Sequence, residues 1–551
     1  MTERAAALVK RFDKLKGERS TFDSHWQEVA ERVWPASATF ITTPQQQGDK
    51  RTEKVFDATA ERALNRFAAA MDSTLTPRTQ RWHAIRVDDD DINDRSDVRR
   101  WCEECTAILF AHRYAPSANF ASQMFEAWKM IGAFGTATLF TDDARAGRFL
   151  LRYQAIHTAN VYVATDFTGM VDTTYRPFKL TARAAAQQFG KDKVTPKIKA
   201  ALDAGKVDDQ FDFVHCVMPA NDVEYAEAQP IRWPWASFYL ALDEKAVVAE
   251  GGYLANPYAT GRFTTMPGES YGRGPAMEAL PDIKTLNEMS KTTLRAAHKA
   301  VDPPLLAFED GVLSAFSTRP NAINYGGVDS QGRQLVVPMQ TGANLPLAFE
   351  MEEQRRRVIN DSFLVTLFQI LVEQPGMTAT EAMLRAQEKG ALLAPTMGRQ
   401  QSEMLGPLIS REFAILMAAR RLPPPPRVLM QSGAQVRIEY VGPLARMQRA
   451  DESVGFLRTM DQITPLATAD PRILKRFNEN EVLKGLSEIN GVPQKWLRTD
   501  EEMAALAEQD RQAAEMANIV QAAPAITQSL KNAAQAQQIA GAQGQPLPAA
   551  A

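Results

Sequence analysis

The chain has little cysteine and no run of apolar residues long enough to cross a membrane. Only Cys102, Cys105 and Cys216 are present among 551 residues, too few for a disulfide framework in a chain of this length. The charged amino-terminal segment lacks the apolar core of a signal peptide, and nowhere do about 20 apolar residues follow one another. These absences predict a protein of a reducing, cytosolic compartment.

The sequence also lacks the common signatures of enzymes. It has no phosphate-binding loop of the Gly-x-x-x-x-Gly-Lys-[Ser/Thr] type, no Gly-x-Ser-x-Gly elbow and no His-Glu-x-x-His pair. Cys102 and Cys105 have the spacing of zinc ligands, but no second pair accompanies them, which favours ordinary helix residues. We therefore expect no cofactor, no bound metal and no catalytic residue.

An acidic run, Asp88 to Asp91, also resembles a metal site. Such a run holds a divalent cation in some nucleases, but four adjacent acids cannot all point toward one ion. A solvated loop is the favoured interpretation, and a metal-dependent nucleic-acid enzyme is kept as a less favoured alternative.

Positive charge is not in excess. Lysine and arginine total 63 against 66 aspartates and glutamates, a formal charge of −3. A nucleic-acid binder of the usual basic kind is therefore not indicated, and any contact with nucleic acid must be local.

Residues 271–420 are the stretch around which the rest is organised. A long helix is predicted to Val301, with Pro275 in its first turn, and Pro303 and Pro304 stop it. Its apolar residues share one broad sector, and basic residues spaced by seven, four and four form a stripe on the other side. The stripe consists of Lys284, Lys291, Arg295 and Lys299.

A second long helix is predicted over residues 350–372, about 33 Å at 1.5 Å per residue. Its first half is polar and carries Arg355, Arg356 and Arg357. A loop interrupts it, and a capping box at Thr378 to Glu381 begins a third helix. We expect kinks or short breaks in this third helix at Gly390, Pro395, Gly398 and Pro407. The loop consists of Glu373, Gln374, Pro375, Gly376 and Met377.

The flanking regions are mixed. Two helices are predicted within residues 3–33, one over 57–75, and one from Asn119 to Ile131 that ends at Gly132-Ala-Phe-Gly135. A strand-rich lobe is predicted over 136–267, and a strand pair over 428–430 and 436–440.

Several motifs, in this order and spacing, resemble the portal (head-to-tail connector) proteins of short-tailed bacteriophages. The longest is Tyr271-Gly-Arg-Gly-Pro-Ala-Met-Glu-Ala-Leu-Pro-Asp-Ile-Lys-Thr-Leu-Asn287, followed by Asp302-Pro-Pro304. Others are Phe22-Asp-Ser-His-Trp26, Phe56-Asp-Ala-Thr59, Thr378-Ala-Thr-Glu381 and Glu403-Met-Leu-Gly-Pro-Leu-Ile-Ser-Arg-Glu-Phe413. The resemblance covers roughly residues 10 to 500.

The resemblance implies an α+β, mainly helical portal fold, assembled as a ring of about twelve subunits. It has long stem helices, a small α/β clip, a β-containing wing and a helical crown. The implied regions are the wing at 1–270, stem helices at 271–301 and 350–372, the clip at 302–349, the channel loop at 373–377, a long kinked helix with wing strands at 378–446 and the crown at 447–520. The tail at 521–551 matches no part of the family pattern, and its Ala/Gln/Gly/Pro composition predicts disorder.

The resemblance also implies a function. The ring is expected at one capsid vertex of the virion, assembled in the host cytoplasm, as a passive, non-enzymatic channel for the packaging and ejection of double-stranded DNA. Expected partners are terminase, the tail adaptor and the capsid and scaffold proteins, with no membrane. The basic stripe and Arg355 to Arg357 are the candidate DNA contacts, and a tail adaptor or tail-tube ring is the alternative.

Overall fold

The structure is a computed structural model that describes most of the chain. It forms two compact units: one of residues 1–86, 104–424 and 436–465, the other of 87–103, 425–435 and 466–551. In the described part, no helix is both long and apolar enough to span a membrane. The described residues are 2–41, 48–93, 95–143, 150–223, 233–307, 317, 319–325, 327–339, 344–366, 394–442, 455–456, 458–465, 477–478, 482–483, 485–487 and 502–513.

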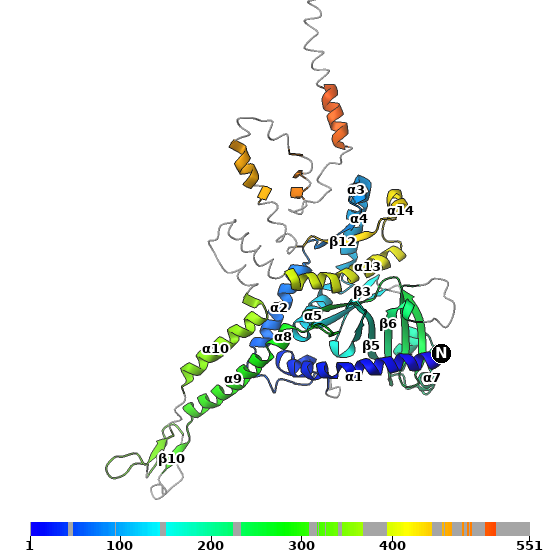
Figure 1. Ribbon diagram of the computed structural model, residues 1–551. Coiled ribbons are helices and arrows are strands. Elements are labelled where there is room, and N and C mark those ends of the chain that lie inside the picture. Colours follow the sequence, from blue (N-terminus) through cyan, green and yellow to red (C-terminus); the bar gives the residue numbers. More distant parts are fainter. Residues whose placement is uncertain are drawn as a thin grey trace, which may run out of the picture. The chain divides into compact units, whose positions relative to one another are not determined.

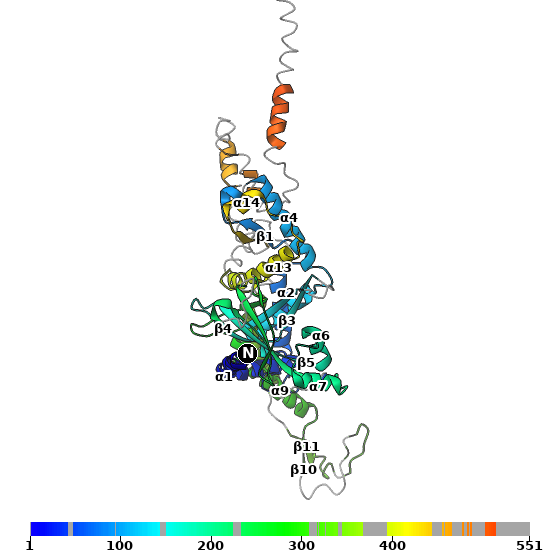
Figure 2. The same cartoon turned by 90° about the vertical axis from the view of Figure 1, so that its right-hand side faces the viewer.

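A five-stranded antiparallel sheet in the larger unit lies between helices (Figures 1 and 2). Its strand order is β4-β5-β6-β7-β8. Because side chains alternate along β6, Val214 and Cys216 pack on α1, whereas Phe213 packs on α6 and α7. The bounds are α1 Thr2–Val33, β4 Tyr162–Thr165, β5 Val171–Thr181, α6 Ala182–Phe189, α7 Pro196–Asp203, β6 Gln210–Pro219, β7 Trp235–Ala241 and β8 Ala246–Tyr253.

α1 is one helix, so the prediction of two helices within residues 3–33 was wrong. The capping signal at Ser20 to Asp23 does not begin a new helix. Asp23 instead pairs with Arg19, one turn earlier in the same continuous helix. The Arg19 guanidinium lies 2.9 Å from Asp23 and donates to the carbonyls of Thr158, Ala159 and Val161 at 2.7–3.0 Å. These bonds fasten α1 to the turn before β4.

A second sheet has the order β3-β2-β9 and packs on α5, which in turn packs on α2. α5 ends within the predicted segment Gly132 to Gly135, although it continues past Ile131. Gly132 serves packing, because a Cβ there would lie 2.6 Å from Leu64 Cδ1. The helix ends at Gly135, which has φ 71°. The bounds are α2 Thr59–Leu75, α5 Phe120–Phe134, β2 Thr136–Asp143, β3 Leu151–Ile156 and β9 Tyr258–Arg262.

Two antiparallel helices leave the sheets side by side and end at a small hairpin (Figure 1). Both predicted long helices are present, but with other bounds. The first is divided at Ala279 into a short helix and a long one that ends at Val301 as predicted. The second, predicted over 350–372, runs from Leu345 to Ser362. Leu305–Ala307 and Val336–Pro338 pair as β10 and β11. The helices are α8 Pro275–Glu278, α9 Leu280–Val301 and α10 Leu345–Ser362.

The third helix is unbroken where it is described, from 394 to 418. Gly398 does not interrupt it. A π-helical segment, η4 (Gln401–Leu405), directly precedes Gly406 and Pro407 and leads into α13 (Gly406–Ala418). The distortion expected at Pro407 is therefore a π-turn rather than a break, because a proline has no N–H to donate.

The strand pair predicted at 428–430 and 436–440 was wrong in its first member. α14 (Arg427–Ser432) is a helix that follows four prolines, and β12 (Val436–Tyr440) pairs with β1 (His83–Val87) instead. The short elements that remain are η1 Pro35–Ser37, α3 Asp90–Asn93, α4 Ser96–Arg113, η2 Thr158–Asn160 and η3 Ala220–Asp222.

Candidate nucleic-acid interface

The basic stripe lies on α9, and the three arginines lie on α10 (Figure 1). The inner half of α9 is fixed to the larger unit by Leu280, Ile283 and Leu286, which are all at least 94% buried. The outer half runs beyond the sheets toward β10, so its side chains are mostly exposed. The sequence thus places a basic helix partly clear of the core.

Asn287 ties a distant loop onto α9. Its Oδ1 accepts hydrogen bonds from the backbone N–H groups of Phe56 (2.8 Å) and Asp57 (3.1 Å), and its Nδ2 donates to the carbonyl of Ile283. Asp57 then pairs with Arg356 of α10 at 3.0 Å. One buried amide and one carboxylate therefore lock the loop and both helices together.

The electrostatics of Asp57 fit this role. Burial acts to raise its pKa, but hydrogen bonds from Thr59 and the guanidinium of Arg356 outweigh it and hold the pKa of Asp57 below its usual value. The carboxylate is therefore charged near neutrality, and the ion pair persists.

On α9, two of the four stripe residues make ion pairs within the chain. Lys284 Nζ lies 2.6 Å from Glu28 of α1. Lys291 Nζ lies 3.3 Å from Glu288 and 5.4 Å from the centre of the Phe56 ring. These two lysines hold α9 in place and are partly neutralised.

All three arginines of α10 are paired as well. Arg355 lies 2.6 Å from Asp282 of α9, and Arg356 lies 2.9 Å from Glu352. Arg357 lies 3.8 Å from Glu353, although its side chain is 77% exposed. With four acids against three arginines, α10 offers no surplus of positive charge.

Arg295 and Lys299 are the stripe residues that the chain leaves uncompensated. Both are exposed, and neither makes an ion pair or hydrogen bond within the part of the chain that the structure describes. They are four residues apart, so they lie on one side of the helix, about 6 Å apart along its axis. Of the seven predicted contacts, these two retain their charge for an outside partner.

The channel-loop candidates cannot be placed. Glu373, Gln374, Pro375, Gly376 and Met377 lie outside the described residues.

The acidic run is the start of a short helix. Asp89 Oδ1 accepts from the backbone N–H of Ile92, Asp90 and Asp91 form the first turn of α3, and Asp88 Oδ1 accepts from the N–H of Gln435 at 2.8 Å. Among the residues described, no group of three or more His, Cys, Asp or Glu side chains could hold a metal ion.

The glycines of the Tyr271 motif serve a close backbone approach. A Cβ on Gly272 would lie 2.3 Å from the carbonyl oxygen of Gly135, and one on Gly274 would lie 2.6 Å from that of Ile131. The Tyr271 hydroxyl donates to no carbonyl there but accepts from the N–H of Val163 at 3.1 Å. The predicted irregular approach to the first long helix is confirmed, and it seats α8 against the end of α5.

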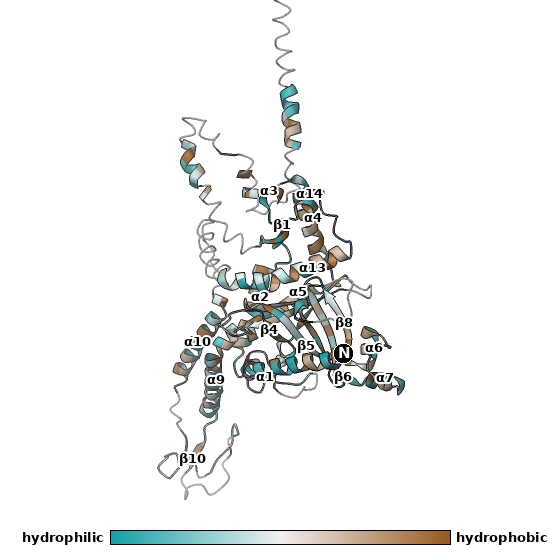
Figure 3. Cartoon of the chain, turned by 45° about the vertical axis from the view of Figure 1, so that its right-hand side comes forward, coloured by the Kyte–Doolittle hydropathy of each residue, from teal (hydrophilic) through white to brown (hydrophobic). Residues whose placement is uncertain are grey.

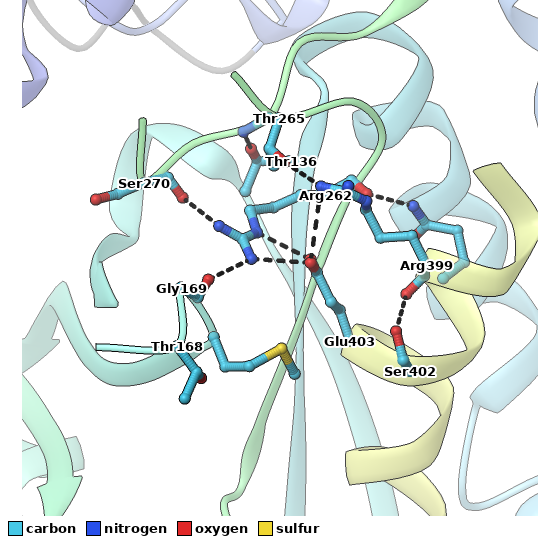
Figure 4. Close-up of polar contacts among 12 residues, drawn as sticks. Thr136, Thr168, Gly169, Arg262, Thr265, Ser270, Arg399, Ser402 and Glu403 are labelled. Atoms are coloured by element: carbon cyan, nitrogen blue, oxygen red, sulfur yellow. Dashed lines mark hydrogen bonds and ion pairs between the residues drawn. The ribbon is translucent and has the colours of Figure 1, made fainter. Parts of the chain in front are cut away.

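Sequence patterns missed a buried ion pair that fastens the third helix to the sheets. Arg262 of β9 binds both carboxylate oxygens of Glu403 at 2.8–2.9 Å and donates to the carbonyl of Gly169 (Figure 4). Glu403 stood in a quoted motif, but nothing in the sequence identified its partner, because Arg262 comes from a distant strand.

A family model described as "Bacteriophage head to tail connecting protein" matches residues 5–497. A probable portal protein of Bordetella phage BPP-1 is 27% identical over 523 residues, covering 93% of each chain. The portal protein of Salmonella phage epsilon15 is 26% identical over 537 residues, covering 96% of this chain and 95% of the relative.

Solved structures were also found. A chain from the virion of a native gene transfer agent particle has a TM-score of 0.34 at 12% identity, covering 81% of this chain and 94% of that one. A chain from the neck of the empty particle has a TM-score of 0.36 at 12% identity, covering 79% and 98%.

Proposed function

Because the chain belongs to the family of bacteriophage head to tail connecting proteins, we propose that it forms a ring at one capsid vertex, through which double-stranded DNA is packaged and ejected. The observation that carries this proposal is the match over residues 5–497, together with relatives named as portal proteins over nearly their whole length. The virion is accordingly its place of action, after assembly in the host cytoplasm.

The proposed regions follow the element order. α9 and α10 are the stem, residues 302–349 the clip, residues 1–270 the wing and 447–520 the crown. In support, α9 and α10 are antiparallel and joined through β10 and β11, which is the order that a stem and clip require. We assign the docking of terminase and of the tail adaptor to the clip.

Arg295 and Lys299 are the proposed DNA contacts. A ring repeats each of them in every subunit, so two side chains become a belt of positive charge. Such a belt attracts phosphates without reading bases, and DNA can slide past it. The chain as a whole stays slightly acidic, at −3.

The role is passive. The energy for packaging is proposed to come from the terminase motor and not from this chain, whose family is one of structural virion proteins. The ring contributes a channel, a charge pattern and docking surfaces.

The test replaces both cations, as Arg295→Gln/Lys299→Gln, in assembling particles. Fewer phosphate contacts should lower the DNA content per particle several-fold while ring formation persists. The matched control is Lys191→Gln/Lys193→Gln, which removes the same charge from an exposed turn beside α6. Unchanged DNA content in the first variant, or an equal loss in the control, would refute the assignment.

A further inference from the structure

We propose that a cleft on the five-stranded sheet binds an extended segment of another polypeptide, one that carries an acidic side chain and, two residues later, an aromatic one. The cleft lies on the sheet face opposite α1, and none of its lining residues belongs to α9 or α10. The proposal therefore goes beyond the proposed ring and does not depend on it.

The cleft is a hollow of about 780 Å³ between α6 on one side and β2 and β3 on the other. Figure 3 shows α6 and α7 on the side of the sheet away from α1. A second hollow, of about 410 Å³, continues it toward the start of α5, because the two share Phe140, Asp142 and Gln154. We call the first hollow the sheet cleft. Its lining includes Arg176, Phe178, Phe189, Ser237, Tyr239 and Gly251.

Small residues leave room above the floor of the sheet cleft. Ser237 of β7 pairs across the strands with Gly251 of β8, and directly paired residues project from the same face of a sheet. Because Ser237 lines the cleft, a side chain at position 251 would point into it as well. A Cβ on Gly251 would meet nothing within 4 Å. The chain's own side chains therefore do not fill this space.

Aromatic rings form the end of the sheet cleft beside α6. The ring centre of Phe189 lies 5.2 Å from that of Tyr239 and 5.5 Å from that of Phe213. Phe178 meets Tyr239 edge-on, at 6.3 Å between ring centres. Rings pack favourably on other rings in tilted and edge-to-face contacts. This end of the cleft therefore suits an aromatic side chain.

Arg176 of β5 supplies a positive charge next to these rings. Its guanidinium carbon lies 5.6 Å from the centre of the Phe178 ring and 5.5 Å from that of Phe140. Its Nη2 donates to Gln154 Oε1 at 3.0 Å. With the residues that the structure describes, Arg176 makes no ion pair. A guanidinium can bind a carboxylate through two parallel hydrogen bonds.

The acidic residues of the sheet cleft each have a basic neighbour of their own. The pairs are Asp143 with Arg411 at 3.8 Å, Glu250 with Arg4 at 3.3 Å, and Asp142 with Arg152, directly opposite on β3. Lys179 likewise lies 3.4 Å from Asp212. The charge that the cleft leaves for a ligand is therefore the positive charge of Arg176, so the complementary ligand is an anion.

The spacing of the two ends indicates an extended peptide. Arg176 and Phe178 are two residues apart on one strand, so they project from the same face about 7 Å apart. Side chains two residues apart in a second extended chain have the same spacing and direction. An Asp or Glu followed two residues later by Phe, Tyr or Trp would thus reach both Arg176 and the aromatic end. The second hollow gives such a chain room to continue.

The test uses the peptide acetyl-Gly-Ser-Asp-Ser-Phe-Ser-Gly-amide, titrated onto the full-length chain and followed by saturation-transfer NMR of the peptide. It should bind saturably. A peptide with Asn in place of Asp should bind about tenfold more weakly or worse, because it loses a charge-assisted pair. Arg176→Gln should weaken the Asp peptide by a similar factor and leave the affinity of the Asn peptide unchanged.

Arg183→Gln is the matched control, because it removes the same charge from an exposed position of α6 that does not line the cleft. It should alter the affinity of neither peptide. No binding of the Asp peptide, an equal loss in Arg176→Gln for both peptides, or an equal loss in Arg183→Gln would overturn the proposal.

Gly251→Leu tests the place of binding, since the added side chain would occupy the sheet cleft. It should abolish binding of the Asp peptide while thermal unfolding and assembly stay as in the unsubstituted chain. Unchanged binding would overturn the proposal. So would a loss of assembly, which would mean that a second copy of this chain occupies the cleft. If this variant does not fold, Arg176→Gln still decides, because it leaves the floor of the cleft intact.

A small carboxylate is the other possible source of the same chemistry, and 3-phenylpropanoate represents it. The peptide should bind more tightly, because it also extends along the cleft. Binding of 3-phenylpropanoate at least as tight as that of the peptide, and equally dependent on Arg176, would assign the cleft to a small molecule and overturn the proposal.

Discussion

Buried charges stabilise the larger unit at the residue scale. Arg113 of α4 and Glu412 of α13 are both fully buried and make a bidentate ion pair, and the Tyr153 hydroxyl donates to the same carboxylate at 2.6 Å. The guanidinium also lies 4.6 Å from the Trp82 ring. Neither charge can be solvated if its partner is removed, so the pair joins α4, β3 and α13 as one unit.

Glu412→Gln should therefore destabilise the chain strongly. The substitution leaves the buried Arg113 guanidinium without its counter-charge, which lowers the free energy of unfolding by about 3–5 kcal/mol. Denaturant unfolding measures the loss. Glu439→Gln is the comparison, because the Arg86–Glu439 pair is partly exposed and is worth about 1 kcal/mol or less. Equal effects of the two substitutions would argue against this account of Glu412.

His157 predicts a dependence on pH. Burial, reinforced by the Arg19 guanidinium, lowers the pKa of His157 to about 4, below its ordinary value of 6.5 in the unfolded chain. Between these values the unfolded state binds more protons, so stability is full above pH 6.5 and falls as the pH drops toward 4. The slope from this group is at most about 1.4 kcal/mol per pH unit.

His157→Asn removes this titration while it keeps a side-chain acceptor for the N–H of Ala159, which the imidazole Nδ1 accepts at 3.1 Å. Unfolding free energies measured from pH 7 to 4.5 should fall less steeply for this variant than for the unsubstituted chain. Parallel curves would show that His157 is not an acid-labile group.

At the element scale, the contact between the Tyr271 motif and the junction of α5 and β2 determines where the α9–α10 hairpin begins. Gly135, Gly272 and Gly274 bring two backbone segments into contact, with no room for a Cβ at any of the three. α8 and α9 begin directly after this contact. Local backbone approach thus fixes where the hairpin leaves the sheets.

Gly274→Ala should cost about 1–3 kcal/mol of stability, because the added methyl group meets the backbone of Ile131 and Gly135. Gly17→Ala in α1 meets nothing within 4 Å and should stabilise the helix by about 0.5–1 kcal/mol. Thermal unfolding of the two variants measures both signs. A neutral Gly274→Ala variant would mean that the contact yields easily.

Helices with a clear hydrophobic periodicity and recognisable boundary residues could be predicted from the sequence. α9, α10 and α2 have amphipathic patterns bounded by proline, glycine or a capping aspartate, and they were found. β8 and β9 were missed because Gly251, Gly252 and Gly261 interrupt the strand pattern. α14 was read as a strand because six residues carry too little periodicity to separate the two.

The candidate contacts were only partly predictable for a different reason. A charge pattern identifies basic residues but not their partners, and Glu28 and Asp57 come from segments far from α9 and α10 in the sequence. Only the folded chain shows that five of seven cations are compensated internally. It is this pairing that reduces the stripe to Arg295 and Lys299.

At the scale of the whole molecule, the family of the chain and the charge distribution on its helical hairpin support the same function. A slightly acidic chain of the head-to-tail connector family carries two uncompensated cations on a helix that extends from its core. In the proposed ring, closure would repeat those two cations in every subunit as a belt of positive charge. No sequence-specific recognition of DNA is needed.

Electron microscopy of the purified full-length chain, with averaging of single-particle images, tests this account most directly. It predicts closed rings with a central hole wide enough for double-stranded DNA, and in virions the same ring at a single capsid vertex with Arg295 and Lys299 facing the hole. Monomers under all assembly conditions, or a ring located in the tail instead of the capsid vertex, would contradict it.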